Sequence, residues 1–166
     1  MTYAMRHVAA GEVPALRAVY ADAVRGLAPG HYAPEQVVVW AGFAASQDFT
    51  GFVLDVMTFV AVAHGDIVGF CGIGPDGHVA SIYVHPAHAR RGIASALLRR
   101  ALAACPAPDA GRWLAEASLL SRPLFQRFGF RQTGVERALR DGVGFERYIM
   151  ARVPDLCDGL RRMPIE

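Results

Sequence analysis

The chain has 166 residues, of which 53% are hydrophobic and 19% are charged, and its formal net charge at pH 7 is +2. This composition is typical of one packed globular domain and excludes a disordered chain. The small net charge argues against a nucleic-acid partner, and no apolar run is long enough to cross a bilayer. The three cysteines, Cys71, Cys105 and Cys157, have neither metal-ligand spacing nor a disulfide pattern. We therefore expect no bound metal, no membrane partner and a cytoplasmic location.

The first third of the chain predicts one short strand followed by helices. Residues 2–7 favour a strand, and Pro14 fits the first turn of a helix whose apolar residues recur at helical spacing to Leu27. A second helix is expected to begin at Pro34. Residues 43–54 are ambiguous, although Asp48 could cap a further short helix.

Three strands are expected next. Residues 57–63 and 67–73 flank the turn signal Gly65-Asp66 and predict a hairpin. A second turn at 74–77 leads to a strand over residues 78–85. Strict alternation would place His78, Ala80, Ile82 and Val84 on one face of that strand, and Val79, Ser81, Tyr83 and His85 on the other.

The second half of the chain continues the alternation of helix and strand. We expect a helix over 91–104, a strand over 113–117, a helix over 119–128 that Gly129 ends, and a strand pair over 130–137 and 145–153. The buried stripe of the first of these helices would be Ile93, Leu97, Leu98 and Leu102. The residues from Pro154 onward are expected to be a short helix or disordered. This order predicts an α/β sandwich with a mixed sheet, in a single domain over 1–166 with its core at about 2–153.

Residues 84–98 carry the strongest functional signal. They predict a strand, a turn opened by Pro86, a basic bend and then a helix. Unpaired N–H groups at a helix N-terminus, beside arginines, form a phosphate site, and the small residues Gly92, Ala94 and Ser95 allow close approach. A turn with a solvated basic face is the alternative. The sequence lacks the Lys-Ser/Thr pair of a P-loop and the glycine pattern of a dinucleotide fold.

Residues 82–98 and a second segment, residues 116–130, together resemble the GCN5-related N-acetyltransferase (GNAT) superfamily. In the second segment a strand precedes a helix whose end falls in the run from Phe125 to Phe130. Gly129 ends this helix, and Phe130 enters the next strand. The resemblance covers about residues 2–153. It implies a mixed, mostly antiparallel sheet with a splayed central parallel strand pair and helices on both faces. It also implies acetyl-CoA as co-substrate.

The resemblance further implies where coenzyme A binds. Its pantetheine arm would lie between strand residues 82–84 and 114–117. Ala89 stands where the family usually has Gln or Arg, so Arg90 and Arg91 would supply the charge, and Ser118 stands where asparagine is usual. The full set of expected contacts is Ile82, Tyr83 and Val84 for the arm, Arg90, Arg91, Gly92, Ile93, Ala94 and Ser95 for the pyrophosphate, and Ser118, Ser121 and Phe125.

The same resemblance assigns candidate catalytic groups. A backbone N–H near Val84 would stabilise the developing oxyanion. His78 is the leading general base and Glu116 the next, while a polar strand start and an ion pair are the respective alternatives. Phe125 stands where the family often has a tyrosine acid, so either the thiolate (pKa about 8.5 for a free thiol) leaves unassisted, or Ser121 or Tyr148 donates a proton.

The acceptor is expected to be a small, partly apolar primary amine, attacked directly in a ternary complex. The resemblance implies that the first two helices and the last strand pair shape its pocket, although most aromatic residues there should belong to the core. These residues are Tyr20, Tyr32, Trp40, Phe43, Phe49, Phe52, Phe145 and Tyr148. The alternatives are a CoA-binding regulatory or sensor module and a peptide N-terminal acetyltransferase. A homodimer is expected by analogy.

Overall fold

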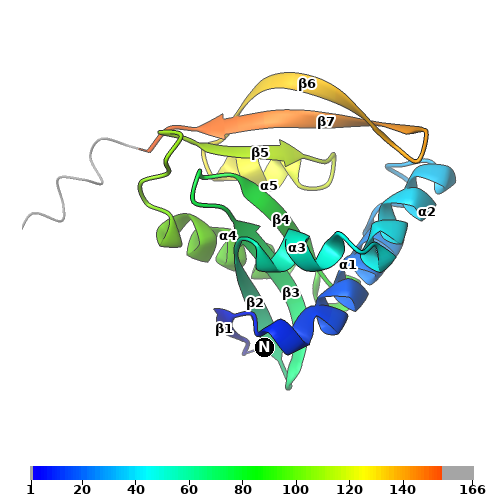
Figure 1. Ribbon diagram of the computed structural model, residues 1–166, viewed down its shortest axis with the longest axis horizontal. Coiled ribbons are helices and arrows are strands. Elements are labelled where there is room, and N and C mark those ends of the chain that lie inside the picture. Colours follow the sequence, from blue (N-terminus) through cyan, green and yellow to red (C-terminus); the bar gives the residue numbers. More distant parts are fainter. Residues whose placement is uncertain (1, 155–166) are drawn as a thin grey trace, which may run out of the picture.

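The computed structural model describes residues 2–154, in which helices lie on both faces of a strand layer (Figure 1). The predicted helices and strands are confirmed, with α5 starting three residues later than expected and the last two strands extending closer to their turn. The predicted helical or disordered tail lies outside the described residues, apart from Pro154. The elements are β1 (Ala4–His7), α1 (Val13–Leu27), α2 (Pro34–Gly42), α3 (Phe49–Leu54), β2 (Met57–Ala63), β3 (Asp66–Ile73), β4 (Val79–Val84), α4 (Ile93–Ala104), β5 (Trp113–Ala117), α5 (Arg122–Arg127), β6 (Arg131–Arg140) and β7 (Val143–Arg152).

The strands form two antiparallel sheets, one in the order β1-β2-β3-β4 and the other in the order β5-β7-β6 (Figure 1). The α/β class is confirmed. The two sheets meet at one isolated parallel bridge between His78 and Leu114, where the Leu114 N–H donates to the Gly77 carbonyl at 3.0 Å. Within residues 2–154 β4 and β5 make no other bridge, so the facing edges of these two strands stay open beyond this point.

Each face of the strand layer has its own core. On one face α4 and α5 cover the strands, and Leu97 and Leu98 of α4 are fully buried, as the predicted stripe requires. On the other face α1, α2 and α3 pack around Tyr20, Phe49 and Phe70, which are also buried. Burying a side chain of this size contributes roughly 1.5–3 kcal/mol. The two cores hold β4 in place from both sides.

The predicted alternation along β4 is wrong at its first residues. The pairing with β3 shifts register between Gly72 and Ile73, so that Gly72 lies opposite Ser81 but Ile73 lies opposite Val79. This is a β-bulge, and it turns one residue out of the pleat. As a result Val79 packs in the same core as Val84.

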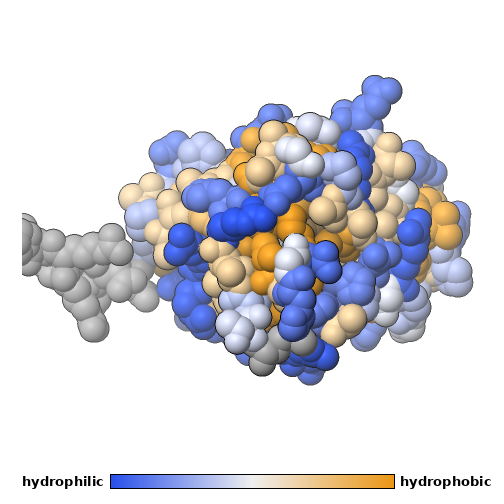
Figure 2. Space-filling model, turned by 90° about the horizontal axis from the view of Figure 1, so that it is seen from below, coloured by the Kyte–Doolittle hydropathy of each residue, from blue (hydrophilic) through white to orange (hydrophobic). Residues whose placement is uncertain are grey.

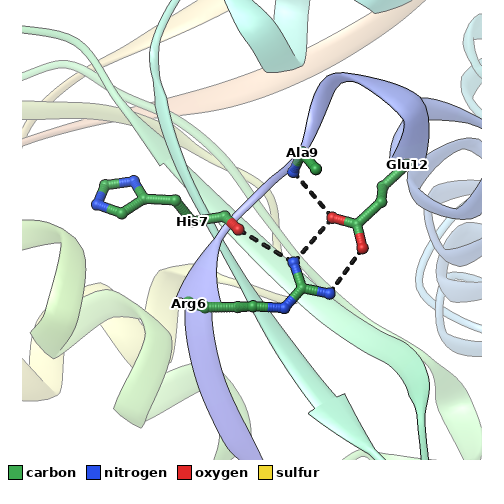
Figure 3. A network of polar contacts seen from close by, with 4 residues as sticks. All are labelled: Arg6, His7, Ala9 and Glu12. Atoms are coloured by element: carbon green, nitrogen blue, oxygen red, sulfur yellow. Dashed lines mark hydrogen bonds and ion pairs between the residues drawn. The ribbon is translucent and has the colours of Figure 1, made fainter.

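Arg6 of β1 forms hydrogen bonds with Glu12, which lies just before α1 (Figure 3). Its two terminal nitrogens donate to the two Glu12 carboxylate oxygens at 2.8 and 2.6 Å, and the Ala9 N–H donates to the same carboxylate at 2.8 Å. The hydrogen bond from Arg6, followed by that from Ala9, lowers the pKa of Glu12 to about 2. The contact fixes the turn through which the chain enters α1.

Some apolar side chains remain at the surface. Figure 2 shows apolar residues between hydrophilic ones on the face seen from below Figure 1. Across the described chain the most exposed large apolar side chains are Val38 of α2 and Leu139 of β6. None of the helices within residues 2–154 combines the length and apolarity needed to cross a membrane.

The Arg6–Glu12 contact should make stability depend on pH. Because the pKa of Glu12 is lowered from 4.5 to about 2 in the folded state, its contribution is complete above 4.5 and is lost as the pH falls toward 2. We expect Glu12→Gln to lower the melting temperature at pH 7, by a margin that shrinks between pH 5 and pH 3. Differential scanning calorimetry measures this margin. Glu35→Gln, at an exposed position on α2, is the control, and a margin independent of pH would contradict the assignment.

Candidate active site

One cavity of about 550 Å³ lies between β4, β5 and the N-terminal end of α4. Residues of α1, α5 and the β6–β7 hairpin complete its wall. The residues that were predicted to contact coenzyme A line this cavity, with the exception of Arg91, which is exposed. Those that line it are Ile82, Tyr83, Val84, Arg90, Gly92, Ile93, Ala94, Ser95, Ser118, Ser121 and Phe125.

The backbone before α4 bends so that the first N–H groups of the helix face the cavity wall. Arg90 and Gly92 both have positive φ angles, 62° and 81°. The Ala96 N–H donates to the Gly92 carbonyl, so the N–H groups of the three residues between them have no partner inside the helix. A Cβ added at Gly92 would meet no atom within 4 Å. Ile93, Ala94 and Ser95 all line the cavity, so the site fits an anion.

The edge of β4 that faces β5 offers unpaired backbone groups. The His85 N–H donates to the Val68 carbonyl at 2.8 Å, toward β3. In an antiparallel pair, successive residues point their backbone groups to opposite edges of the strand. The N–H groups of Val84 and Ile82 therefore point away from β3, toward the gap between the sheets. The backbone of Tyr83 points toward β3, so Tyr83 contributes its side chain to the cavity.

A polar turn joins β5 to α5 at the opposite wall. The Ser118 hydroxyl accepts from the Leu120 and Ser121 N–H groups, while the Ser118 N–H donates to the Ser121 hydroxyl at 3.0 Å. These reciprocal bonds hold both hydroxyl groups at the cavity. Phe125, one turn further on, is only 2% exposed and packs edge to face on Phe130 at 5.1 Å. It supplies an apolar surface and no proton.

His78 and Glu116 form an ion pair across the two sheets. His78 Nε2 lies 2.5 Å from Glu116 Oε2, close to the bridge that joins β4 to β5. The hydrogen bond to Glu116 raises the pKa of His78, although burial opposes it, and the same bond lowers the pKa of Glu116. Glu116 lines the cavity, whereas His78 is not among the residues that line it. Glu116 is therefore the member of the pair that a ligand in this cavity would meet.

Aromatic side chains surround the other end of the cavity. Tyr32, Trp40, Tyr83 and Phe145 line it, and the rings of Tyr32 and Trp40 pack edge to face at 5.2 Å. Trp40 Nε1 donates to the Tyr83 hydroxyl at 3.3 Å. The other aromatic candidates lie elsewhere, as expected for most of them: Tyr20, Phe43, Phe49 and Phe52 pack in the core, and Tyr148 lines a second hollow.

Several cavity residues were missed by sequence reasoning. Arg140 and Arg147 come from the β6–β7 hairpin, and Arg127 comes from the end of α5. Neither arginine of the hairpin belongs to a local motif, because pairing between distant strands brings them here. Arg127 lies inside the Phe125 to Phe130 run and could have been proposed from it. Within residues 2–154 no three His, Cys, Asp or Glu side chains are arranged to hold a metal ion.

Comparisons with known proteins agree with this geometry. The family model for an acetyltransferase (GNAT) domain matches residues 29–151. YafP of Escherichia coli K12, an uncharacterized N-acetyltransferase, is 27% identical over 150 residues, which are 90% of this chain and 95% of YafP. A GCN5-related N-acetyltransferase structure from Rhodopseudomonas palustris superposes with a TM-score of 0.86 at 23% identity and covers 92% of this chain and 96% of its own. The structure of the PaiA N-acetyltransferase of Thermoplasma acidophilum in complex with coenzyme A superposes with a TM-score of 0.71 at 17% identity. The match covers 92% of this chain and 99% of the PaiA chain.

The pair of His78 and Glu116 is testable by titration. We expect the His78 imidazole to titrate above its ordinary pKa of 6.5, and Glu116→Gln to move that pKa back down, because the main cause of the rise is removed. Proton NMR of the imidazole resonances from pH 5 to 9 measures it. Asp22→Asn, whose carboxylate faces His85 instead, is the matched control. An unchanged titration of His78 in Glu116→Gln would refute the pairing.

Proposed function

The chain belongs to the GNAT acetyltransferase family and is an acetyl-CoA-dependent N-acetyltransferase, and we propose that its acceptor is a primary amine of a small molecule. One observation carries the proposal. A single cavity extends from the anion site at the start of α4 to the carboxylate of Glu116, and it passes the open edge of β4 on the way. A bound thioester and an amine could therefore meet inside one space.

We propose that the diphosphate of coenzyme A is held by the first N–H groups of α4, with Arg90 and Arg127 beside it. The positive end of the helix dipole and the two guanidinium groups favour an anion there. The backbone groups of Ile82 and Val84 would pair with the amide groups of the arm as a neighbouring strand does. The Ser118 and Ser121 hydroxyl groups stand on the opposite wall of the cavity.

The transfer proposed here needs one base and one oxyanion donor. The acceptor nitrogen forms a bond to the acetyl carbon, the carbon–sulfur bond breaks, and coenzyme A leaves as its thiolate, which is protonated from solvent. The N–H of Val84 points into the gap and would stabilise the charge that develops on the carbonyl oxygen. No tyrosine is needed as acid, because a thiolate is a tolerable leaving group near neutral pH.

We propose that Glu116 takes the proton of the acceptor amine and that His78 is its positioning residue and proton relay. Of these two residues, Glu116 lines the cavity. When His78 is protonated, its ion pair makes the carboxylate a weak base, which the lowered pKa of Glu116 expresses. When His78 loses its proton, the pair carries a net negative charge and accepts a proton more readily. The rate should therefore rise as the pH passes through the raised pKa of His78.

Replacing Glu116 tests the proposed reaction. Release of free thiol from acetyl-CoA, measured against a panel of small primary amines, should show turnover that Glu116→Gln lowers by about 100-fold or more in kcat/KM. The Kd of coenzyme A should stay unchanged. In the wild type, kcat/KM should rise as the pH increases through the pKa that NMR gives for His78. The variant His78→Gln should lack this rise in the pH profile. Glu35→Gln is the control. Unchanged turnover in Glu116→Gln would refute the assignment. So would a failure of every amine in the panel to cause release of free thiol.

Replacing Gly92 tests the anion site. Gly92→Ala puts a side chain on a residue at φ 81°, which costs roughly 1–2 kcal/mol and tilts the N–H groups that follow. We expect the Kd of coenzyme A to rise about tenfold in isothermal titration calorimetry, since one misaligned donor costs about that much. Gly30→Ala is the matched control, because Gly30 also has a positive φ (88°) and open space around it but lies outside the cavity. Equal effects of both variants on Kd would contradict the site.

A further inference from the structure

We propose that Arg147 is a positioning residue for the proposed reaction: its charge, which Glu136 holds in place, sets the pH at which the pair of His78 and Glu116 begins to accept a proton. This inference rests on the proposed function and adds two residues of the β6–β7 hairpin to it. The observation that carries it is a row of four side chains, Glu136, Arg147, Glu116 and His78, which we call the charge row.

The strand register puts the charge row on one face of the second sheet. Glu136 of β6 lies directly opposite Arg147 of β7. Glu116 of β5 lies opposite Ile149, two residues further along β7. Residues two apart on a strand share a face, and such diagonal neighbours lie about 7–8 Å apart, within reach of long side chains. His78 completes the row through its ion pair with Glu116, so the charges alternate from strand to strand.

Glu136 holds the guanidinium group of Arg147. A terminal nitrogen of Arg147 donates to a Glu136 carboxylate oxygen at 2.6 Å. The Nε atom of Arg147 is buried and has no hydrogen-bond partner within residues 2–154. Glu136 therefore fixes one side of the guanidinium group and compensates only part of its charge. Arg147 lines the cavity, as Glu116 does, and acts on the carboxylate of Glu116 through its charge.

The charged groups that face His78 come from three parts of the chain. The hydrogen bond to Glu116 of β5 is the main cause of the raised pKa of His78, and the charge of Asp76 adds to it. Asp76 lies in the preceding turn, where its carboxylate accepts from the His78 N–H at 3.1 Å. Burial and the charge of Arg147 oppose this rise in pKa. The pKa of Glu116 is lowered mainly by its hydrogen bond to His78, and Arg147 lowers it further.

Arg147 and Glu136 should act on the pair with opposite signs. A nearby positive charge disfavours the imidazolium form, so Arg147 lets His78 lose its proton at a lower pH. In the proposed reaction the rate rises when His78 loses this proton, so Arg147 moves the rise to lower pH. Glu136 weakens this effect, because its carboxylate compensates the charge of Arg147. The charge row thus extends the working range of the pair toward neutral pH.

Two variants of the charge row test this inference. We expect Arg147→Gln to move the rise in kcat/KM to higher pH by about 0.5 to 1, because unit charges about 7–8 Å apart at a partly exposed site interact by this much. At pH 7 kcat/KM should fall about three- to tenfold, while the plateau at high pH is retained. Glu136→Gln should move the rise to lower pH. Arg147→Lys, which keeps the charge, should retain most of the wild-type profile.

Proton NMR of the His78 imidazole measures the same effect without turnover. The titration of His78 should move to higher pH in Arg147→Gln and to lower pH in Glu136→Gln. Arg137→Gln is the matched control, because it removes a positive charge of the same hairpin from the opposite face of β6, where Arg137 lines the second hollow. This control should change neither the titration nor the rate profile.

Each other outcome contradicts a definite part of the inference. Shifts of the same sign in Arg147→Gln and Glu136→Gln, or an equal shift in Arg137→Gln, would overturn it. Activity that Arg147→Gln lowers equally at every pH would indicate a structural role and would overturn it as well. An unshifted titration of His78, with turnover that still depends on Glu116, would overturn it and leave the proposed function intact. Titration shifts that the rate does not follow would refute Glu116 as the base, and with it the role of Arg147 in the reaction.

Discussion

The single parallel bridge between His78 and Leu114 is the constraint on which the rest of the site depends. If β4 and β5 continued to pair, the backbone groups of Ile82 and Val84 would be satisfied by β5 and could hold no ligand. Instead β5 pairs on its other edge with β7, and the second sheet separates from the first. An open edge on a surface invites aggregation, but this one lies inside a cavity that α5 and the hairpin wall off.

The bulge next to that bridge decides which side chains meet. By shifting the register between Gly72 and Ile73, it lets Val79 fill the core under α4. His78 then lies against Glu116 of the second sheet. His78 therefore takes part in both the bridge to Leu114 and the ion pair with Glu116. The bulge, the bridge and the charged pair therefore lie side by side at the start of the open edge.

Much of this could be predicted from the sequence, because it is local. The helical spacing of Ile93, Leu97 and Leu98, the glycine bend before them and Gly129 after α5 are short-range signals, and the structure follows them. Two features could not be predicted in this way. The bulge in β4 depends on pairing with β3, which strict alternation ignores. The place of Arg140 in the cavity wall depends on how distant strands pair. The family resemblance predicted a coenzyme end with contacts mostly to the backbone, and it left the acceptor end open.

The two ends of the cavity solve different electrostatic problems. At the start of α4 the free N–H groups, Arg90 and Arg127 create a positive field, which suits a highly charged phosphate group. Elsewhere in the lining Glu116 carries a negative charge, and the rings of Tyr32, Trp40 and Phe145 add apolar surface. The Glu116 carboxylate would repel a polyanion bound next to it. The positive N-terminal end of α4 would repel an ammonium group. The buried ring of Phe125 belongs to the lining as well and adds no charge. The charge pattern thus sets the direction in which donor and acceptor enter, before any contact specific to either is made.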